Sequence, residues 1–359
     1  MSPLAPPIFD GHNDVLTRLL KAGGLDAADQ FVTGRGGHID VDKAKAGGFG
    51  GGFFAVWVPA ADGGSPIYND MTKPQYDLPL PPPIPADQAI EAVDTEIAIL
   101  RRLEELGALT VCTDTAMIRA CLAEGRMAAI LHMEGAEAID PDFAVLDNLY
   151  TRGLRSLGPV WSRPTIYGEG VPFRFPGTPD IGGGLTPDGV RLVERCNALH
   201  IMIDLSHINE AGFWDVAKHS TQPLVATHSN AHVLCPHARN LTDRQLEAIA
   251  ESDGMVGLNF AVAFLRSDGR MLADVALDQM LRHFDHLIAI LGEDRVGFGS
   301  DFDGAVIPQD IADASGLPKL RQAMIDHGYN DALMTKLCHA NWLRVLEKTW
   351  GACGSARTD

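Results

Sequence analysis

The 359-residue sequence predicts an α/β fold, a single (β/α)8 TIM-type barrel with loop insertions on the face where the strands end. Short apolar runs alternate with amphipathic helical segments along the chain, about eight times. Several of the runs are almost continuously apolar, as in parallel strands that are covered on both faces. No short repeat or shift in composition marks a second domain, so we expect residues 1–359 to form one domain.

Eight apolar runs are the expected strands. In chain order they are residues 8–12, 52–59, 127–133, 154–161, 201–206, 224–228, 255–260 and 295–300. Segments with helical periodicity lie between them, including residues 86–106, 186–199, 209–220, 242–252 and 274–291. Thr186 and Thr242 stand where N-cap residues belong, and Gly292 stands where a glycine would end a helix.

Two segments interrupt this alternation. Residues 62–85 are rich in proline and glycine, and residues 162–184 add aromatic residues without helical periodicity. Both follow expected strands. We therefore expect both to be loops at the carboxyl ends of strands, where insertions shape access to the site of a barrel.

Composition and charge limit the classes of function. Hydrophobic residues at 46% and charged residues at 21% indicate a globular protein with a large core. The formal net charge of -18 argues against nucleic acid and anionic membranes as partners. No apolar stretch approaches the roughly 20 residues that cross a bilayer, and no secretory signal is visible at the N-terminus. The six cysteines show no C-x-x-C pairing and are expected to be free thiols, so we expect a cytoplasmic protein.

Five side chains that can bind metal stand at the ends of expected strands. His12 and Asp14 flank one residue of an extended segment, so they point the same way and can chelate one ion. Glu134, His207 and His228 each end another apolar run. Either of these last two histidines alone would more often be a hydrogen-bonded loop residue than a ligand. Because parallel barrel strands converge on one mouth at their carboxyl ends, we expect all five side chains to meet.

The chemistry of this set favours a hydrolytic centre with two metal ions. Imidazole and carboxylate ligands without a thiolate suit Zn²⁺ better than Mn²⁺ or Fe²⁺. One carboxylate can bridge two cations about 3.5–4 Å apart, and a water that they share loses its proton near neutral pH. Asp301, at the end of the last expected strand, is placed to bind that water and to pass its proton to a leaving amine. We expect Asp303, two residues later, to cap a helix.

The segments around these side chains resemble the membrane (renal) dipeptidase family, which are metallopeptidases of the amidohydrolase superfamily. The resemblance covers nearly the whole chain and is carried by residues 10–14, 42–51, 134–135, 203–207, 227–230, 238–240 and 299–304. It implies a zinc-dependent dipeptidase that cleaves the amide bond of dipeptides with a metal-bridging hydroxide. It also implies tolerance of a D-residue at the C-terminal position of the substrate, and a homodimer.

The resemblance assigns the metal ligands position by position. His12 and Asp14 resemble the ligands of the first zinc, and His207 and His228 resemble those of the second. Glu134 resembles the carboxylate that bridges the two ions. The implied cofactor is therefore two Zn²⁺ per chain.

Three further positions carry implied roles in the reaction. Asp301 resembles the proton-transferring acid, and Arg239 resembles the arginine that pairs with the C-terminal carboxylate of the substrate. Trp161 departs from the family, because members carry a histidine there that contacts the substrate carbonyl. An indole N–H donates one hydrogen bond but cannot carry charge or accept a proton. Trp161 therefore acts as a neutral donor, packs as a pocket wall, or leaves the role to Arg163 or Tyr167.

Two other functions stay open. Trp161 and the loop at residues 162–184 are also compatible with another amide substrate: an N-acyl amino acid, a lactam or a secondary-metabolite peptide. The second alternative is a non-catalytic, metal-stabilised binding scaffold. It is disfavoured, because a degenerate relative would not be expected to keep all five ligand positions together with Asp301.

Overall fold

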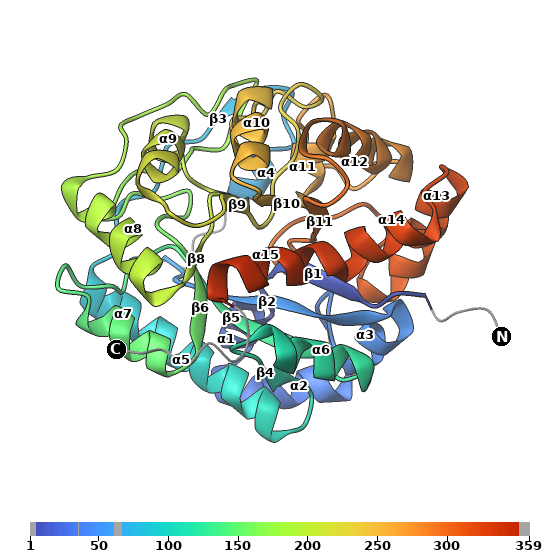
Figure 1. Ribbon diagram of the computed structural model, residues 1–359, viewed down its shortest axis with the longest axis horizontal. Helices are drawn as coiled ribbons and strands as arrows, with labels where there is room; N and C mark the ends of the chain where they lie inside the picture. Colours follow the sequence, from blue (N-terminus) through green and yellow to red (C-terminus); the bar gives the residue numbers. More distant parts are fainter. Residues whose placement is uncertain (1–4, 35, 61–66, 352–359) are drawn as a thin grey trace.

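The computed structural model describes residues 5–34, 36–60 and 67–351, and its centre is a nearly closed barrel of eight parallel strands (Figure 1). The hydrogen-bonded order is β8-β6-β5-β2-β1-β11-β10-β9. Between the two outer strands, the Leu205 N–H donates to the Val225 carbonyl at 2.9 Å. The predicted barrel is thereby confirmed. The strands are β1 (Ile8–Asn13), β2 (Phe49–Trp57), β5 (Ala128–Glu134), β6 (Leu154–Gly158), β8 (Met202–Ile203), β9 (Val225–Ala226), β10 (Met255–Asn259) and β11 (Val296–Gly299), with β4 (Thr110–Val111) paired to β5.

Helices surround the barrel, and the five segments named for helical periodicity are all helical (Figure 1). The Thr186 hydroxyl accepts from the Gly189 N–H, and Thr242 forms a reciprocal capping box with Gln245. Gly292 ends α12, as predicted. The helices are α1 (Val15–Lys21), α2 (Ala28–Thr33), α3 (Val41–Gly47), α4 (Ile67–Asp70), α5 (Ala86–Glu105), α6 (Thr115–Ala123), α7 (Ala144–Thr151), α8 (Pro187–Leu199), α9 (Glu210–His219), α10 (Asp243–Glu251), α11 (Val262–Leu265), α12 (Leu277–Leu291), α13 (Leu317–Asp326), α14 (Asp331–Thr335) and α15 (Asn341–Trp350), with short 3-10 turns at Gly24–Ala27 and Ala314–Gly316 and a π turn at Lys336–Ala340.

The two predicted loop insertions contact each other. Tyr76–Asp77 (β3) of the first loop pairs with Arg174–Phe175 (β7) of the second in a two-stranded antiparallel sheet. The Tyr76 hydroxyl also donates to the Gly269 carbonyl at 2.5 Å. Residues 61–66 of the first loop lie outside the described residues. The loops are therefore joined above the strand ends, which their irregular sequences do not indicate.

The barrel interior is a packed core rather than a channel. Trp342 of α15 is fully buried, and its Nε1–H donates to the Phe298 carbonyl at 3.0 Å. Gly11, Gly257 and Gly297 lie on the three neighbouring strands β1, β10 and β11, and a Cβ at any of them would lie 3.0 Å or less from the indole. Glycine at these positions therefore makes room for the tryptophan.

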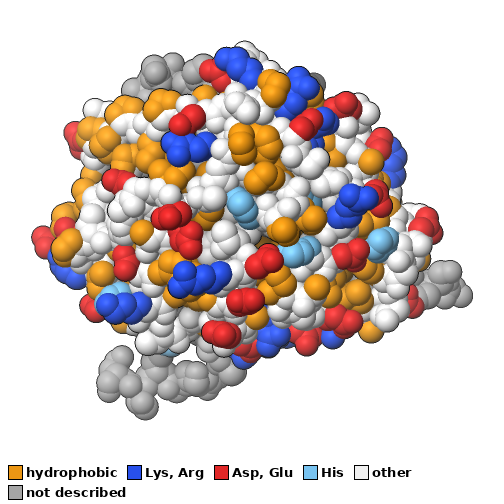
Figure 2. Space-filling view, turned by 90° about the horizontal axis from the view of Figure 1, so that it is seen from above, with side chains coloured by type: hydrophobic (Ala, Val, Ile, Leu, Met, Phe, Trp, Pro, Cys, Tyr) orange, Lys and Arg blue, Asp and Glu red, His pale blue; other side chains and the backbone are white. Residues whose placement is uncertain are grey.

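The surface and the cysteines agree with the composition. The five described cysteines are buried and free, as predicted, and Cys353 lies outside the described residues. Within the described part of the chain, no helix combines the length and apolarity that a membrane crossing requires. On the face shown in Figure 2, lysine and arginine side chains lie singly among acidic and apolar ones. That face offers no broad basic patch of the kind that binds nucleic acid.

Candidate metal centre

The five predicted ligands meet at the carboxyl ends of the strands, around the carboxylate of Glu134. One of its oxygens, Oε2, lies 3.7 Å from His12 Nε2. The other, Oε1, lies 2.9 Å from His207 Nε2 and 3.5 Å from His228 Nε2. Asp14 Oδ2 lies 3.3 Å from His12 Nε2. The two oxygens of Glu134 therefore face two different sets of side chains.

Ligand atoms from different strands come within reach of a common ion in two overlapping groups. His12, Glu134 and His228 form one group, and His12, Asp14 and Asp301 form the other. In each group the candidate atoms lie within 4.8 Å of one another. Neither ring nitrogen of His12 has a hydrogen-bond partner in the described residues, although both are buried. Because buried polar atoms normally have partners, this histidine fits a metal ligand.

The electrostatics of the cluster also favour bound cations. Burial works against a charged His12, but the carboxylates of Glu134 and Asp14 outweigh it and raise the pKa of His12 to about 10. Burial raises the pKa of Glu134 well above its usual range. Burial, followed by the charge of Asp14, raises the pKa of Asp301. Buried carboxylates this close repel one another, and bound divalent cations would relieve that repulsion.

A chain of hydrogen bonds sets the orientation of His228. The Thr227 hydroxyl donates to Asp204 Oδ2 at 2.6 Å, and its oxygen lies 2.8 Å from His228 Nδ1. Since the hydroxyl proton is engaged, Nδ1–H of His228 donates to Thr227, which leaves Nε2 free to bind metal. Sequence analysis missed Asp204 and Thr227. For Asp204 the available signal was a carboxylate within an otherwise apolar run, three residues before a candidate ligand.

Arg239 is buried behind His207 and does not line the pocket. Its Nε lies 3.1 Å from His207 Nδ1, which also lies 2.9 Å from the Ser162 hydroxyl oxygen. Its terminal nitrogens donate to the Ser229 hydroxyl at 3.1 Å and the His228 carbonyl at 3.2 Å. Burial lowers its pKa to about 10, against the attraction of Asp301. The predicted carboxylate-binding arginine is thus brought to the centre, where it contacts both histidines of the second predicted ion.

Asp301 and Asp303 have different surroundings. Asp301 Oδ2 accepts from Asn259 Nδ2 at 3.1 Å, so the last residue of β10 positions it. The expectation that Asp303 caps a helix is wrong. It accepts instead from Arg18 Nε at 3.0 Å and from the His38 N–H at 2.5 Å. The chain turns back here through left-handed conformations, with φ of 58° at Asp301 and 69° at Asp303, so no helix begins at this point.

Trp161 forms part of an aromatic wall of the pocket. Its ring centroid lies 5.1 Å from that of Trp57, 5.8 Å from that of Phe173 and 5.7 Å from that of His207. The guanidinium carbon of Arg163 lies 5.2 Å from its ring on the buried side. These contacts are those of a packed side chain.

The two residues considered as substitutes for the family histidine are engaged elsewhere. Arg163 is buried and forms an ion pair with Glu137 at 3.0 Å. The Tyr167 hydroxyl donates to the backbone, 3.1 Å from the Ile139 carbonyl and 3.0 Å from that of Asp140. Neither Arg163 nor Tyr167 is among the described residues that line the pocket.

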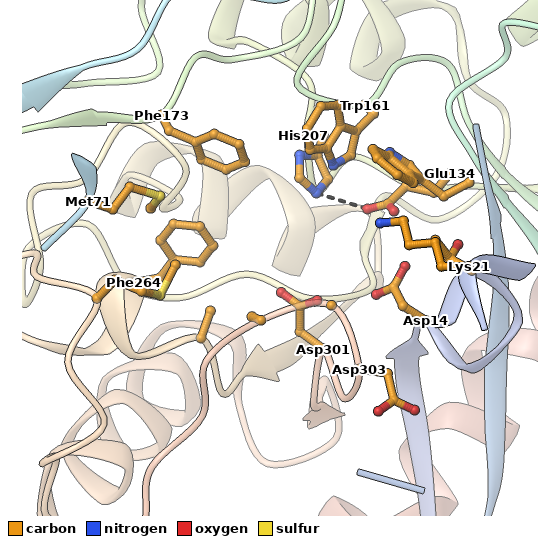
Figure 3. Close-up of a pocket in the computed structure, with 16 residues that line it drawn as sticks. Asp14, Lys21, Met71, Glu134, Trp161, Phe173, His207, Phe264, Asp301 and Asp303 are labelled. Atoms are coloured by element: carbon orange, nitrogen blue, oxygen red, sulfur yellow. Dashed lines mark ion pairs between the residues drawn. The ribbon is translucent and has the colours of Figure 1, made fainter. Parts of the chain in front are cut away.

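The pocket above the metal ligands has two unlike sides. Figure 3 shows Met71, Phe173 and Phe264 on one side and Lys21 on the other, beside Asp14 and Glu134. A pocket that combines an apolar surface with a few convergent polar groups is typical of small-molecule sites. Its arrangement offers metal ligands and a carboxylic acid in the middle, an apolar surface on one side and a cation on the other.

Comparison with known proteins places the chain among metallopeptidases. The family model described as membrane dipeptidase (peptidase family M19) matches residues 5–353. A metallo peptidase from Rhodobacter sphaeroides, liganded with a phosphinate mimic of the dipeptide L-Ala-D-Ala, is 55% identical, with a TM-score of 0.94 over 96% of this chain and 100% of that one. A dipeptidase of family M19 is also 55% identical, with a TM-score of 0.94 over 97% and 100%. An uncharacterized protein in the pqqA 5' region of Klebsiella pneumoniae is 47% identical over 269 residues, which are 74% of this chain and 99% of that protein.

Proposed function

The chain belongs to the membrane dipeptidase family, and on that premise we propose that it hydrolyses the amide bond of dipeptides, including those with a D-residue at the C-terminal position. The observation that carries the proposal is the meeting of His12, Asp14, Glu134, His207 and His228 around one carboxylate. The relative bound to a dipeptide mimic, at 55% identity, supports the choice of substrate.

We assign two zinc ions to this centre, with Mn²⁺ or Fe²⁺ as alternatives. His12 and Asp14 would hold the first ion, His207 and His228 the second, and Glu134 would lie between them. When bound, such ions polarise the scissile carbonyl and lower the pKa of water toward neutrality. The support is the donor set itself, together with the two buried ring nitrogens of His12 that have no hydrogen-bond partner among the described residues.

Asp301 is assigned the proton transfer. Its Oδ2 is held by Asn259, which leaves Oδ1 as the atom to take a proton from the attacking water and deliver it to the leaving amine. The carboxylate is buried and borders the pocket together with Glu134 and His207. A group fixed in this way needs little reorganisation during the reaction, because its position is set before the substrate binds.

Arg239 and Trp161 are assigned to substrate binding. A guanidinium has five N–H donors, two of them on each terminal nitrogen. In Arg239 one N–H of each terminal nitrogen donates to a described protein acceptor, which leaves the other on each for the C-terminal carboxylate of the substrate. Arg239 lies behind His207 and next to the apolar side of the pocket, with its guanidinium carbon 5.6 Å from the ring of Phe264. Trp161 is assigned to the pocket wall on the strength of its aromatic contacts.

Two further assignments concern the cellular location and the oligomeric state of the enzyme. We place it in the cytoplasm, a choice supported by the five buried free thiols, and we expect a homodimer as in the family. Fractionation of the source cells and light scattering on the purified full chain test these two assignments.

The deciding experiment is hydrolysis of a substrate panel by the zinc-loaded protein and its Asp301→Asn variant. The panel holds L-Xaa-L-Xaa and L-Xaa-D-Xaa dipeptides, with N-acyl amino acids and a lactam as the rival class. We expect dipeptides to be cleaved and the variant to lose about 10²–10⁴ in kcat, the usual range for general acid–base catalysis. Metal content of both proteins is measured alongside. Cleavage of the rival class alone would overturn the proposal, and Trp161 in place of the family histidine is the observation that keeps this class in the panel.

A further inference from the structure

The pocket has one cation that the proposed reaction does not use. Lys21, the last residue of α1, lines the pocket opposite the apolar side formed by Met71, Phe173 and Phe264 (Figure 3). Its ammonium nitrogen lies 5.1 Å from the ring centroid of Trp57, which forms a cation–π contact. The side chain is exposed, and no ion pair within 4.0 Å involves it among the described residues.

The carboxylates of the pocket are committed elsewhere. Asp14 and Glu134 are proposed metal ligands, and two bound divalent ions would neutralise them. Asp303 is held by Arg18 and by the backbone of His38, and Asp301 accepts from Asn259 and is assigned the proton transfer. In the metal-loaded site, none of the carboxylates that line the pocket is therefore left as an ion-pair partner for Lys21. An anionic group on the substrate would supply one.

The position of Lys21 decides which end of the substrate it faces. Arg239, assigned to the C-terminal carboxylate, lies behind His207 and beside Phe264, on the apolar side. The scissile bond must lie at the metal ligands between the two cations. The residue N-terminal to that bond therefore extends toward Lys21 and Trp57.

We propose that Lys21 is a specificity residue that selects dipeptides with aspartate or glutamate at the N-terminal position. The inference rests on the proposed dipeptidase function. The ammonium group would bind the side-chain carboxylate from its place beside the ring of Trp57. A neutral glutamine side chain of nearly the same shape would lack this charge-assisted contact.

The test compares L-Glu-L-Ala with L-Gln-L-Ala as substrates of the zinc-loaded protein. We expect the kcat/KM ratio of the two to be about tenfold in the wild type, the size of one hydrogen bond to a charged group. In Lys21→Met the ratio should fall to about one. In Lys21→Glu the preference should move to L-Lys-L-Ala. A wild-type ratio near one, or an unchanged ratio in Lys21→Met, overturns the inference.

Lys45→Met is the matched control. Lys45 is also an exposed lysine in the last turn of a seven-residue helix, α3, but it lies outside the lining of the pocket. Its variant should keep the wild-type ratio.

A binding measurement separates failure of the inference from failure of the proposed function. Phosphinate analogues of L-Glu-L-Ala and L-Gln-L-Ala are titrated into zinc-loaded wild type and Lys21→Met by calorimetry. If no dipeptide is cleaved but the glutamate analogue binds more tightly through Lys21, the selectivity stands and the proposed reaction fails. Equal affinities in the wild type overturn the selectivity, whatever the protein hydrolyses.

Discussion

The three histidines among the proposed metal ligands differ in what holds their rings in place. His207 and His228 have Nδ1 engaged by Arg239 and Thr227, so hydrogen bonds hold their rings. His12 is held by packing instead: its ring centroid lies 3.9 Å from that of His228 and 5.6 Å from that of His132. Loss of a neighbouring hydrogen-bond partner should therefore affect the first two histidines more than His12.

Trp161→Phe separates the two remaining roles of the tryptophan. Phenylalanine keeps an aromatic wall against Trp57 and Phe173 but removes the indole N–H. Because the indole of Trp161 makes ring contacts with its neighbours, we expect kcat for a cleaved dipeptide to change by less than about threefold, whereas loss of an oxyanion donor costs about 10²–10³. Steady-state kinetics measure this, and a fall in kcat of a hundredfold would instead assign Trp161 the role of donor.

The ligand positions could be read from the sequence because each combines a metal-binding residue type with the end of an apolar run. The same reasoning does not predict a role for Thr227, because threonine is common in strands and so does not indicate a functional site. It also failed for Asp303, whose partners Arg18 and His38 are 285 and 265 residues away in the chain. Contacts at such separation leave no local pattern.

At the level of secondary-structure elements, hydrogen bonds between neighbouring strand ends hold the metal centre together. Asp204, which follows β8, accepts from the Thr227 backbone N–H at 2.8 Å as well as from its hydroxyl, so it links β8 to β9. Asp10 of β1 accepts from the backbone and hydroxyl of Ser300, which follows β11, both at 2.6 Å. These carboxylates fix the relative position of strands that each carry ligands.

Thr227→Val tests the link between β8 and β9. The change keeps the side-chain shape but leaves Asp204 and His228 Nδ1–H without the hydroxyl between them. We expect zinc affinity to fall about 10–100-fold, as for other partners of ligating histidines. Competition with a chromophoric chelator measures the affinity. Thr349→Val is the control, because Thr349 is equally buried but bonds within α15, and an unchanged affinity in Thr227→Val would contradict the assigned role.

His283 of α12 makes a pH-dependent connection between elements. Its Nδ1 accepts from the Ala231 N–H at 3.2 Å, so Nε2–H donates to the Leu265 carbonyl at 3.1 Å. Burial lowers its pKa from 6.5 to about 4. In the unfolded chain it binds a proton near pH 6.5, so its contribution to stability is complete above pH 6.5 and is lost as pH falls toward 4. The loss amounts to up to about 3 kcal/mol.

Urea unfolding of metal-free wild type and His283→Gln at pH 7 and pH 4.5 measures this contribution. The variant is expected to be less stable at pH 7 but to lose less of its free energy of unfolding on acidification. Equal losses in the two proteins would show that His283 does not titrate as its burial predicts.

For the whole molecule, we propose that residues 1–359 unfold as one domain whose stability includes metal binding. One barrel contains all the ligands, and strands from both ends of the chain, β1 and β11, lie side by side in it (Figure 1). Opening either strand would therefore disrupt the metal centre and the barrel together.

Metal removal should destabilise the protein without dividing its unfolding into steps. With free zinc about 100-fold above its Kd, binding to the folded state alone adds about 3 kcal/mol. We expect calorimetry to show one transition with and without chelator, at lower temperature in the chelated protein, and restored by added zinc. Two separate transitions would contradict the single domain. An unchanged midpoint would contradict a metal centre tied to the fold.

The sequence by itself determined the barrel and the residue types at the carboxyl ends of its strands, because periodicity and residue type are local properties. Since the carboxyl ends of parallel barrel strands all lie at one end of the barrel, these residues could be expected to meet. The tertiary structure decided what depends on distant contacts. It turned the two oxygens of Glu134 to different histidines, placed Arg239 behind His207, and joined the two loops over the pocket through β3 and β7. It also brought Lys21 to the pocket opposite Phe264. The orientation of a side chain depends on neighbours from other strands, and no local pattern records them.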